Sequence, residues 1–244
     1  MDYQAELYLN PYFNYLRFYK EGKLTDCELV FPEENEIAPI KAHAIILANS
    51  SDFFLNAFTG NLGEAKSGKV QMTDNPMNLL PKVIEFLYSG KLEYTEGEVM
   101  SLLHIANAYF IQSLQHRMHC HLNSTLNHQN IYEFANQCYQ YELEAELVDK
   151  KEGLVPYFVK FFDKLNIENL TQTLDVITFC YILEGLNKPY EETFRILDQF
   201  IGPEWKCDKE EKEACGKLFN TGDPKVRNFL AKKKPTWLPD GYLK

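Results

Sequence analysis

Apolar and polar positions alternate with a period of two close to the N-terminus. In the stretch LTDCELVF, residues 24–31, the side chains of Cys27, Leu29 and Phe31 fall on one side. Such alternation predicts a half-buried β-strand. A polar turn then leads to a second short stretch, residues 37–41, so we expect these two strands to form a hairpin.

A dense apolar segment, AHAIILANSSDFFLNAF, follows at residues 42–58. Its interruption by Asn-Ser-Ser predicts two consecutive short helices, with Ser50 or Ser51 capping the second. Farther along, KVQM at residues 69–72 and KLEY at residues 91–94 are typical of short strands.

Two longer helices are expected around the KLEY stretch. Asn75 before Pro76 marks the start of the first, and Gly90 marks its end. Thr95 and Glu98 have the spacing of a capping box at the start of the second. The apolar face of that second helix is formed by Val99, Leu102, Leu103, Ala106 and Phe110.

From about Asn127 onward the pattern has helical periodicity only. The four apolar faces are Ile131, Phe134, Ala135 and Cys138; Val155, Phe158, Phe162 and Leu165; Leu174, Ile177 and Tyr181; and Tyr190, Phe194, Leu197 and Ile201. The chain is therefore predicted to be a mixed α+β domain, a small sheet flanked by helices, followed by an all-helical domain.

Composition agrees with a folded protein of two ordinary domains, because 45% of the 244 residues are hydrophobic and 25% are charged. The formal net charge of −10 gives no general attraction to nucleic acid or to anionic lipid. One basic cluster, Lys232 to Lys234, is short and is interpreted as a solvated tail. No apolar run reaches membrane-spanning length and no secretory leader opens the chain, so we expect a cytoplasmic or nuclear protein without a membrane partner.

Candidate catalytic and metal-binding residues are sparse. The six cysteines include no C-x-x-C pair and are predicted to be reduced. His116, His119, Cys120 and His121 form the sharpest metal-like cluster, but no second ligand group follows at zinc-finger spacing. Phosphate-binding glycine loops and a nucleophile elbow are absent from the sequence. We therefore predict no catalytic residues, no metal and no cofactor, and an enzyme built on Cys and His residues is the weakest hypothesis.

The stretch AFTGNLGEAKSGKV, residues 57–70, is rich in turn-forming residues yet carries one large apolar residue, Leu62, two positions before Glu64. From composition alone, Leu62 could fill a core or wait for a partner. The place of this loop between the helix expected at Phe53–Phe58 and the strand that begins at Lys69 favours the second interpretation, because exposed apolar anchors flanked by polar residues are what docking surfaces require.

Four ordered motifs resemble the BTB/POZ domain over about residues 10–126. They are GKLTDCELVF, IKAHAIILANSSDFF, VIEFLYSGKLE and LLHIANAYFIQSL. The helical remainder is similar to a BACK-type extension through HQNIYEFANQC and, more loosely, PYEETFRILDQFI. This resemblance implies a BTB/POZ domain at 1–126, a BACK-like helical domain at 127–202 and a C-terminal extension at 203–244.

The resemblance also implies a non-catalytic interaction module that forms a homodimer through a helix ahead of the first strand. Here that helix would lie in NPYFNYLRFYKEG, and the alternative is that it folds back on its own domain. The implied dimer residues are Tyr12, Tyr15, Leu16, Tyr19 and Asp26. The chain departs from the family where Ala44 replaces the basic residue after the motif histidine, His43, which makes a transcriptional corepressor role less favoured.

BTB proteins with a BACK-like region are often substrate adaptors of cullin-RING E3 ubiquitin ligases, and the resemblance implies this role here. By position, Leu62, Glu64 and Tyr109 would contact the cullin. About 40 residues remain after the last expected helix, too few for a sizeable substrate-binding domain. Substrate would meet the helical domain, the C-terminal WLPDGYLK or a separate protein. The alternative is an oligomerisation scaffold or transcription-regulatory module without a ligase.

Overall fold

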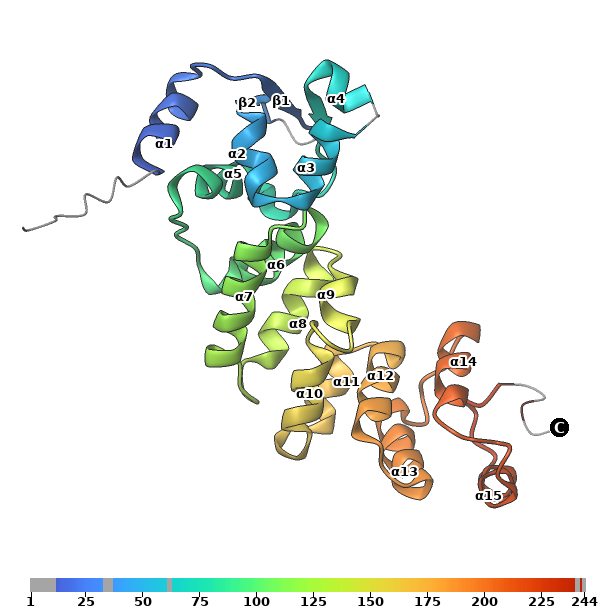
Figure 1. Ribbon diagram of the computed structural model, residues 1–244. Coiled ribbons are helices and arrows are strands. Elements are labelled where there is room, and N and C mark those ends of the chain that lie inside the picture. Colours follow the sequence, from blue (N-terminus) through green and yellow to red (C-terminus); the bar gives the residue numbers. More distant parts are fainter. Residues whose placement is uncertain (1–11, 33–36, 61–62, 240–241, 243–244) are drawn as a thin grey trace, which may run out of the picture. The chain divides into compact units, whose positions relative to one another are not determined.

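The computed structural model describes residues 12–32, 37–60, 63–239 and 242. Two compact units make up the chain, Met1–Cys120 and His121–Lys244, and we call them the N-terminal unit and the helical unit (Figure 1). The boundary falls within helix α7 (Gln112–Thr125). Each unit is described by itself.

A three-stranded mixed sheet lies in the N-terminal unit, with the strand order β2-β1-β3. Strand β1 (Cys27–Val30) pairs antiparallel with β2 (Ile40–Ala42), as the hairpin prediction requires. It pairs parallel with β3 (Lys69–Gln71) on its other side. The alternating positions Cys27 and Leu29 are buried, so the period of two reports the buried face correctly.

Two short helices follow the hairpin, as the Asn-Ser-Ser interruption predicts. They are α2 (Ala44–Ser50) and α3 (Asp52–Thr59). Ser51 separates them because its hydroxyl accepts the backbone N–H of Phe54 and thereby caps α3. The same hydroxyl donates to the carbonyl of Tyr109 at 2.6 Å, which fixes α3 to a distant part of the chain.

Two local predictions for the next segment need correction. Asn75 and Pro76 do begin a helical turn, but it is a 3₁₀ turn (Pro76–Asn78) in which Met77 and Asn78 have positive φ, and helix α5 begins only at Leu80. α5 (Leu80–Ser89) then ends, as predicted, at Gly90 in a left-handed conformation. The KLEY stretch forms no strand, since the hydroxyl of Ser89 bonds both the N–H and the carbonyl of Lys91 in a local turn.

The capping box of Thr95 and Glu98 is confirmed. It opens a 3₁₀ turn (Glu96–Glu98) that continues into α6 (Val99–Ala108). The first four of the five expected apolar positions of α6 are buried, whereas the fifth, Phe110, lies beyond the helix and is exposed. A left-handed φ of 48° at Phe110 ends the helix before its side chain can turn inward.

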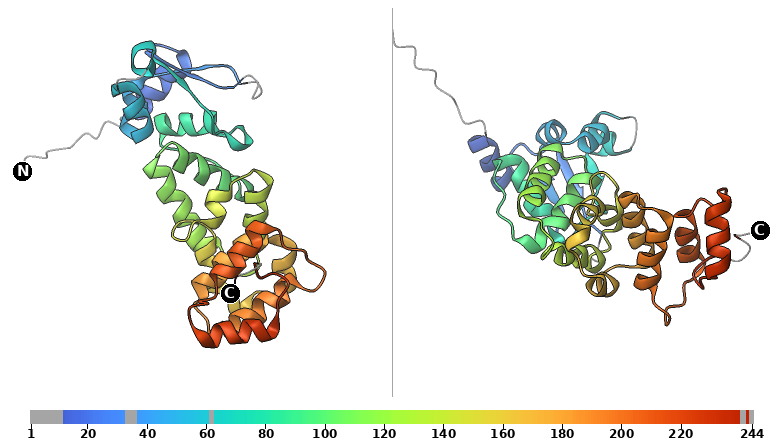
Figure 2. Two further views of the ribbon diagram at one scale, coloured as in Figure 1. Left: turned by 90° about the vertical axis from the view of Figure 1, so that its right-hand side faces the viewer. Right: turned by 90° about the horizontal axis from the view of Figure 1, so that it is seen from below.

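Only helices are found among the described residues of the helical unit, drawn from green to red in Figure 2. The helices are α8 (Ile131–Gln140), α9 (Glu144–Val148), α10 (Val155–Phe161), α11 (Ile167–Thr173), α12 (Val176–Leu186), α13 (Tyr190–Ile201), α14 (Lys209–Lys217) and α15 (Pro224–Lys233), with a 3₁₀ turn at Phe162–Lys164. The predicted order of a mixed α+β region and then an all-helical one is thus confirmed.

Helix α12 buries a different face from the expected one. Phe179 is fully buried and stacks on Phe200 of α13 with ring centroids 3.7 Å apart. The expected positions Ile177 and Tyr181 are only half-buried. The helix is apolar almost all round, so its sequence does not define one preferred face.

The C-terminal segment packs into the core of the helical unit. Trp237 is 2% exposed and lies between the rings of Phe194 in α13 and Phe219 after α14, at centroid distances of 5.4 and 5.6 Å. Its indole N–H donates to Asp198 at 3.3 Å. Residues 203–239 therefore share one unit with residues 127–202, and a separate domain identity for 203–244 stays a prediction.

All six cysteines are free thiols. Cys180 and Cys215 approach within 3.8 Å but are not bonded covalently. Cys120 is exposed, and its sulfur lies 3.5 Å from Nε2 of His116. Among the described residues, no helix is long and apolar enough to cross a membrane.

Candidate functional site

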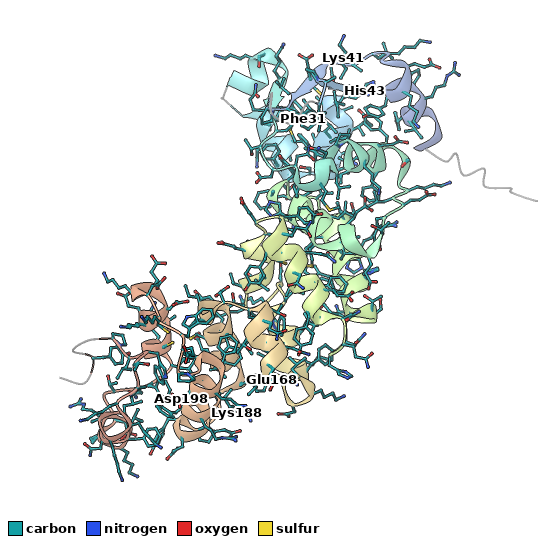
Figure 3. The ribbon with its side chains drawn as sticks, turned by 180° about the vertical axis from the view of Figure 1, so that it is seen from behind. Phe31, Lys41, His43, Glu168, Lys188 and Asp198 are labelled. Carbon is teal, nitrogen blue, oxygen red and sulfur yellow. The ribbon has the colours of Figure 1, made fainter. Side chains whose placement is uncertain are left out.

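A hydrogen-bonded cluster joins the start of α2 to α5 in the N-terminal unit. The hydroxyl of Tyr88 accepts the backbone N–H of His43 at 2.8 Å and contacts its Nδ1 at 2.9 Å. The Nε2 of His43 lies 2.8 Å from the carbonyl of Lys23. These contacts are satisfied together when Nε2 carries the proton and Nδ1 accepts from Tyr88. The arrangement fixes the imidazole as a structural link; Figure 3 labels His43 directly after β2.

Asp26, predicted to lie in a dimer interface, is exposed and accepts the backbone N–H of Ala44 at 2.7 Å. Ala44 stands where the family has a basic residue, and its backbone N–H is the donor to the Asp26 carboxylate. The nearest base, Lys41, faces Glu28 across the β1–β2 pair and forms no ion pair with Asp26 in the described part of the chain. Asp26 therefore stabilises the start of α2, and its part in a dimer stays a prediction.

Helix α1 (Tyr12–Glu21) carries the predicted aromatic face. Tyr19 stacks on Tyr88 with centroids 4.5 Å apart, so this end of the helix packs on its own unit. Tyr15 is 46% exposed and Leu16 is half-buried, whereas the side chain of Tyr12 lies outside the described residues. The two alternatives for this face were packing on its own domain and contact with a second chain. Tyr19 packs on its own domain, whereas Tyr15 is exposed, and its contact with a second chain stays a prediction.

Two further exposed apolar side chains of this unit were missed from the sequence. Leu24 is 80% exposed and Ile45 is 72% exposed. They belong to neighbouring segments, since Lys23 contacts His43 and Asp26 accepts the N–H of Ala44. The run Ile45-Ile46-Leu47 contained a usable clue, since three successive residues of a helix cannot all face the core. We call Tyr15, Leu24 and Ile45 the apolar cluster.

The predicted docking loop lies between α3 and β3. Leu62 is outside the described residues, and the backbone of Glu64 belongs to the short helix α4 (Gly63–Ser67) while its side chain is not described. The described neighbours Gly63, Lys66 and Ser67 are exposed. The loop thus runs over the surface of the N-terminal unit, and contact of Leu62 and Glu64 with a partner stays a prediction.

Tyr109 is 2% exposed, so the structure places this predicted contact residue in the interior. Its ring packs against Phe53 and Phe54, with centroids 5.0 and 6.2 Å away. Its hydroxyl accepts the backbone N–H of Asp74 at 2.9 Å, and burial raises its pKa. Contact of Tyr109 with a partner stays a prediction; within the unit the residue packs on α3, and the next residue, Phe110, is 57% exposed.

The order of hairpin, paired short helices and capped helices around these links can be compared with known families. Residues 15–126 match the BTB/POZ domain family. They form a BTB/POZ domain. Domains of this family are generally non-catalytic, mediate protein–protein interaction and typically dimerise. The apolar cluster thus lies on a domain whose general role is association.

Curated relatives match part of the chain. Kelch-like protein 7 from Gallus gallus and from Homo sapiens is 33% identical over 96 residues, which is 39% of this chain and 16% of the relative. Kelch-like protein 3 from Homo sapiens is 32% identical over 94 residues, 38% of this chain and 15% of the relative. The chain therefore covers less than a fifth of each relative's length.

Within the BTB/POZ domain, the His43–Tyr88 link gives a testable stability effect. Tyr88 is fully buried, and burial raises its pKa, so its neutral hydroxyl acts as donor and acceptor. Tyr88→Phe is expected to lower the free energy of unfolding by about 1–3 kcal/mol, because the N–H of His43 loses its acceptor. Urea denaturation followed by circular dichroism measures this change.

Tyr141→Phe is the matched control, since its hydroxyl accepts only a solvent-exposed bond from Gln140. It should change the free energy of unfolding by less than about 0.5 kcal/mol. Equal effects of the two substitutions would contradict a structural role for the His43–Tyr88 link.

The metal-like cluster of α7 does not assemble into a site among the described residues, where no group of three or more His, Cys, Asp or Glu side chains is suited to hold a metal ion. His116 and Cys120 do meet, at a helical spacing of four. His119 and His121 do not join them.

Proposed function

We propose that the protein is a non-catalytic substrate adaptor of a cullin-RING E3 ubiquitin ligase. In this proposal the BTB/POZ domain forms a homodimer and docks a cullin through Leu62 and Glu64. The helical unit acts as a BACK-like extension that brings a protein substrate close. Such an adaptor works by raising effective concentration and needs no bond chemistry of its own.

The observation that carries this proposal is the surface position of the loop between α3 and β3 on a BTB/POZ domain. Three described residues of α4, Gly63, Lys66 and Ser67, are exposed, which supports a docking role for this loop. An apolar anchor with an adjacent carboxylate provides burial energy and orientation together. Tyr109 enters the proposal as a positioning residue behind this surface.

The helical unit supports the second part of the proposal. α8 covers most of HQNIYEFANQC, and α13 covers most of PYEETFRILDQFI, the two stretches that resemble a BACK-type region. Trp237 and Leu238 of WLPDGYLK are buried, which makes this stretch the less favoured of the substrate-binding positions. Among the alternatives considered from the sequence, a site on the helical unit or a separate protein remains.

Cullin binding is tested by titrating the full chain with the N-terminal domain of the cullin that serves BTB adaptors. Leu62→Ala and Glu64→Ala are each expected to weaken binding at least about tenfold, because each removes one half of the docking motif. Isothermal titration calorimetry measures the affinities.

Lys66→Ala is the control, since it alters an exposed residue of the same short helix outside the motif. Its affinity should match that of the unchanged protein. No binding at tens of micromolar, or equal affinities for all variants, would refute the adaptor proposal.

A second candidate function is an oligomerisation scaffold without a ligase. The apolar cluster favours it specifically, because this surface supports self-association whether or not a cullin binds. A stable dimer with no affinity for the cullin domain would select the scaffold.

A further inference from the structure

A cavity of about 430 Å³ lies in the helical unit. It is bounded by α12, by Thr193 of α13, by α14 and by the loop that follows α9. This volume falls within the range of pockets that enclose small ligands or a few side chains of a peptide.

One part of the cavity wall is apolar. Leu183 of α12 and Ala214 and Leu218 of the α14 region contribute aliphatic surface. Next to them, the ring of Tyr181 faces the ammonium group of Lys150, which lies 5.0 Å from the ring centroid. The cavity can therefore bury an apolar side chain beside a charged group.

The charged residues of the lining are three lysines and one glutamate. Lys150 pairs with Glu184 at 2.7 Å, and Lys188, labelled in Figure 3, pairs with Glu192 at 2.7 Å. Lys217 has no ion-pair partner within the described part of the chain. Two of the three lysines are thus neutralised by neighbouring carboxylates, and Lys217 is the cation that favours an anionic group of a ligand.

The loop that carries Lys150 is held in one shape by its own backbone. Asp149 accepts the N–H groups of Lys151 and Glu152 at 2.7 and 2.6 Å, and these bonds lower its pKa. At Gly153 a Cβ atom would approach backbone atoms of Glu146 and Asp149 to within 2.7–2.9 Å. The loop thus holds Lys150 at the cavity without help from a ligand.

We propose that this cavity binds a short peptide that carries an apolar side chain next to a carboxylate. The apolar side chain packs on Leu183 and Leu218, and the carboxylate pairs with Lys217. A peptide fits better than a nucleic acid because part of the lining is aliphatic and the protein as a whole is acidic. The carboxylate can come from an internal acidic residue or from a C-terminus.

If the adaptor proposal holds, such a peptide would be part of the substrate, and that interpretation rests on the proposed function. Peptide binding itself does not require a cullin. Loss of cullin binding with peptide binding retained would refute only the adaptor role. Cullin binding without peptide binding would refute only the peptide site.

Three fluorescein-labelled Gly/Ser nonapeptides test the proposal by fluorescence polarisation with the full chain. One contains a central Leu-Glu step and an amidated C-terminus, one ends in leucine with a free carboxylate, and one contains Leu-Gln and is amidated. We expect the Leu-Glu peptide or the peptide with a free C-terminal leucine to bind at least about tenfold more tightly than the Leu-Gln peptide. Whichever of these two binds more tightly identifies the source of the carboxylate. Absence of binding up to millimolar protein, or equal binding of all three, would overturn the proposal.

Substitutions at Lys217 locate the site. Lys217→Glu is expected to weaken the binding of the preferred peptide at least about tenfold, whereas Lys217→Arg retains it. Lys225→Glu is the matched control, because Lys225 is an exposed lysine of the same unit that does not line the cavity. Thermal melting verifies that each variant is folded, and an unchanged affinity for Lys217→Glu would refute the assignment.

Discussion

Trp237→Ala is expected to lower the free energy of unfolding of the helical unit by about 3–5 kcal/mol, because the substitution leaves a large cavity in a packed core. The indole lies between Phe194 and Phe219, and its N–H donates to Asp198. Chemical denaturation followed by far-ultraviolet circular dichroism measures the loss. The C-terminal segment should also become sensitive to proteolysis, since Trp237 anchors it to α13.

The chain provides its own control for this prediction, since it contains only two tryptophans. Trp205 is 42% exposed and makes one long contact from its indole N–H to Glu211. Trp205→Ala should cost less than about 1 kcal/mol. If the two substitutions had the same effect, the C-terminal segment would not belong to the core of the helical unit.

A second large effect is expected at the apolar cluster of the BTB/POZ domain. The double substitution Leu24→Asp with Ile45→Asp should weaken homodimerisation at least about a hundredfold, because two carboxylates would have to be desolvated in the interface. Sedimentation velocity over a micromolar concentration range should show a dimer for the unchanged chain and a monomer for the variant.

Leu55→Asp is the matched control for the dimer experiment. Leu55 is a 42% exposed leucine of α3, outside the apolar cluster. The dimer should persist in this variant. A monomeric unchanged chain, or a dimer unaffected by the double substitution, would contradict the role given to Leu24 and Ile45.

Features that depend on neighbours within a few residues could be predicted from the sequence. The capping box of Thr95 and Glu98 and the break at Ser51 follow from side chains that bond nearby backbone groups. The hairpin and the helical second half follow from periodicity, and the ordered motifs indicated a BTB/POZ domain. KLEY was predicted wrongly because strand propensity supplies no pairing partner, and a local turn at Ser89 and Lys91 used the backbone groups first.

The residues of the candidate site were named from the sequence, and their contact with a partner stays a prediction. The sequence did not indicate that Tyr109 is buried or that its hydroxyl accepts the backbone N–H of Asp74. That the segments of Leu24 and Ile45 are neighbours could not be predicted, since the hydrogen-bonded residues that join these segments, Lys23 and His43, lie 20 positions apart in the chain. Which end of α1 stays available was also undecided until Tyr88 provided a stacking partner for Tyr19.

The sequence by itself therefore determined the local elements, their order and the resemblance to an interaction domain, because short-range hydrogen bonds and periodicity are contained in adjacent residues. Only the tertiary structure decided which apolar side chains are covered. The face of α12, the burial of Trp237 and the exposure of Ile45 all depend on side chains contributed by distant segments. Burial is a property of the assembled contacts, and a single stretch of chain does not contain them.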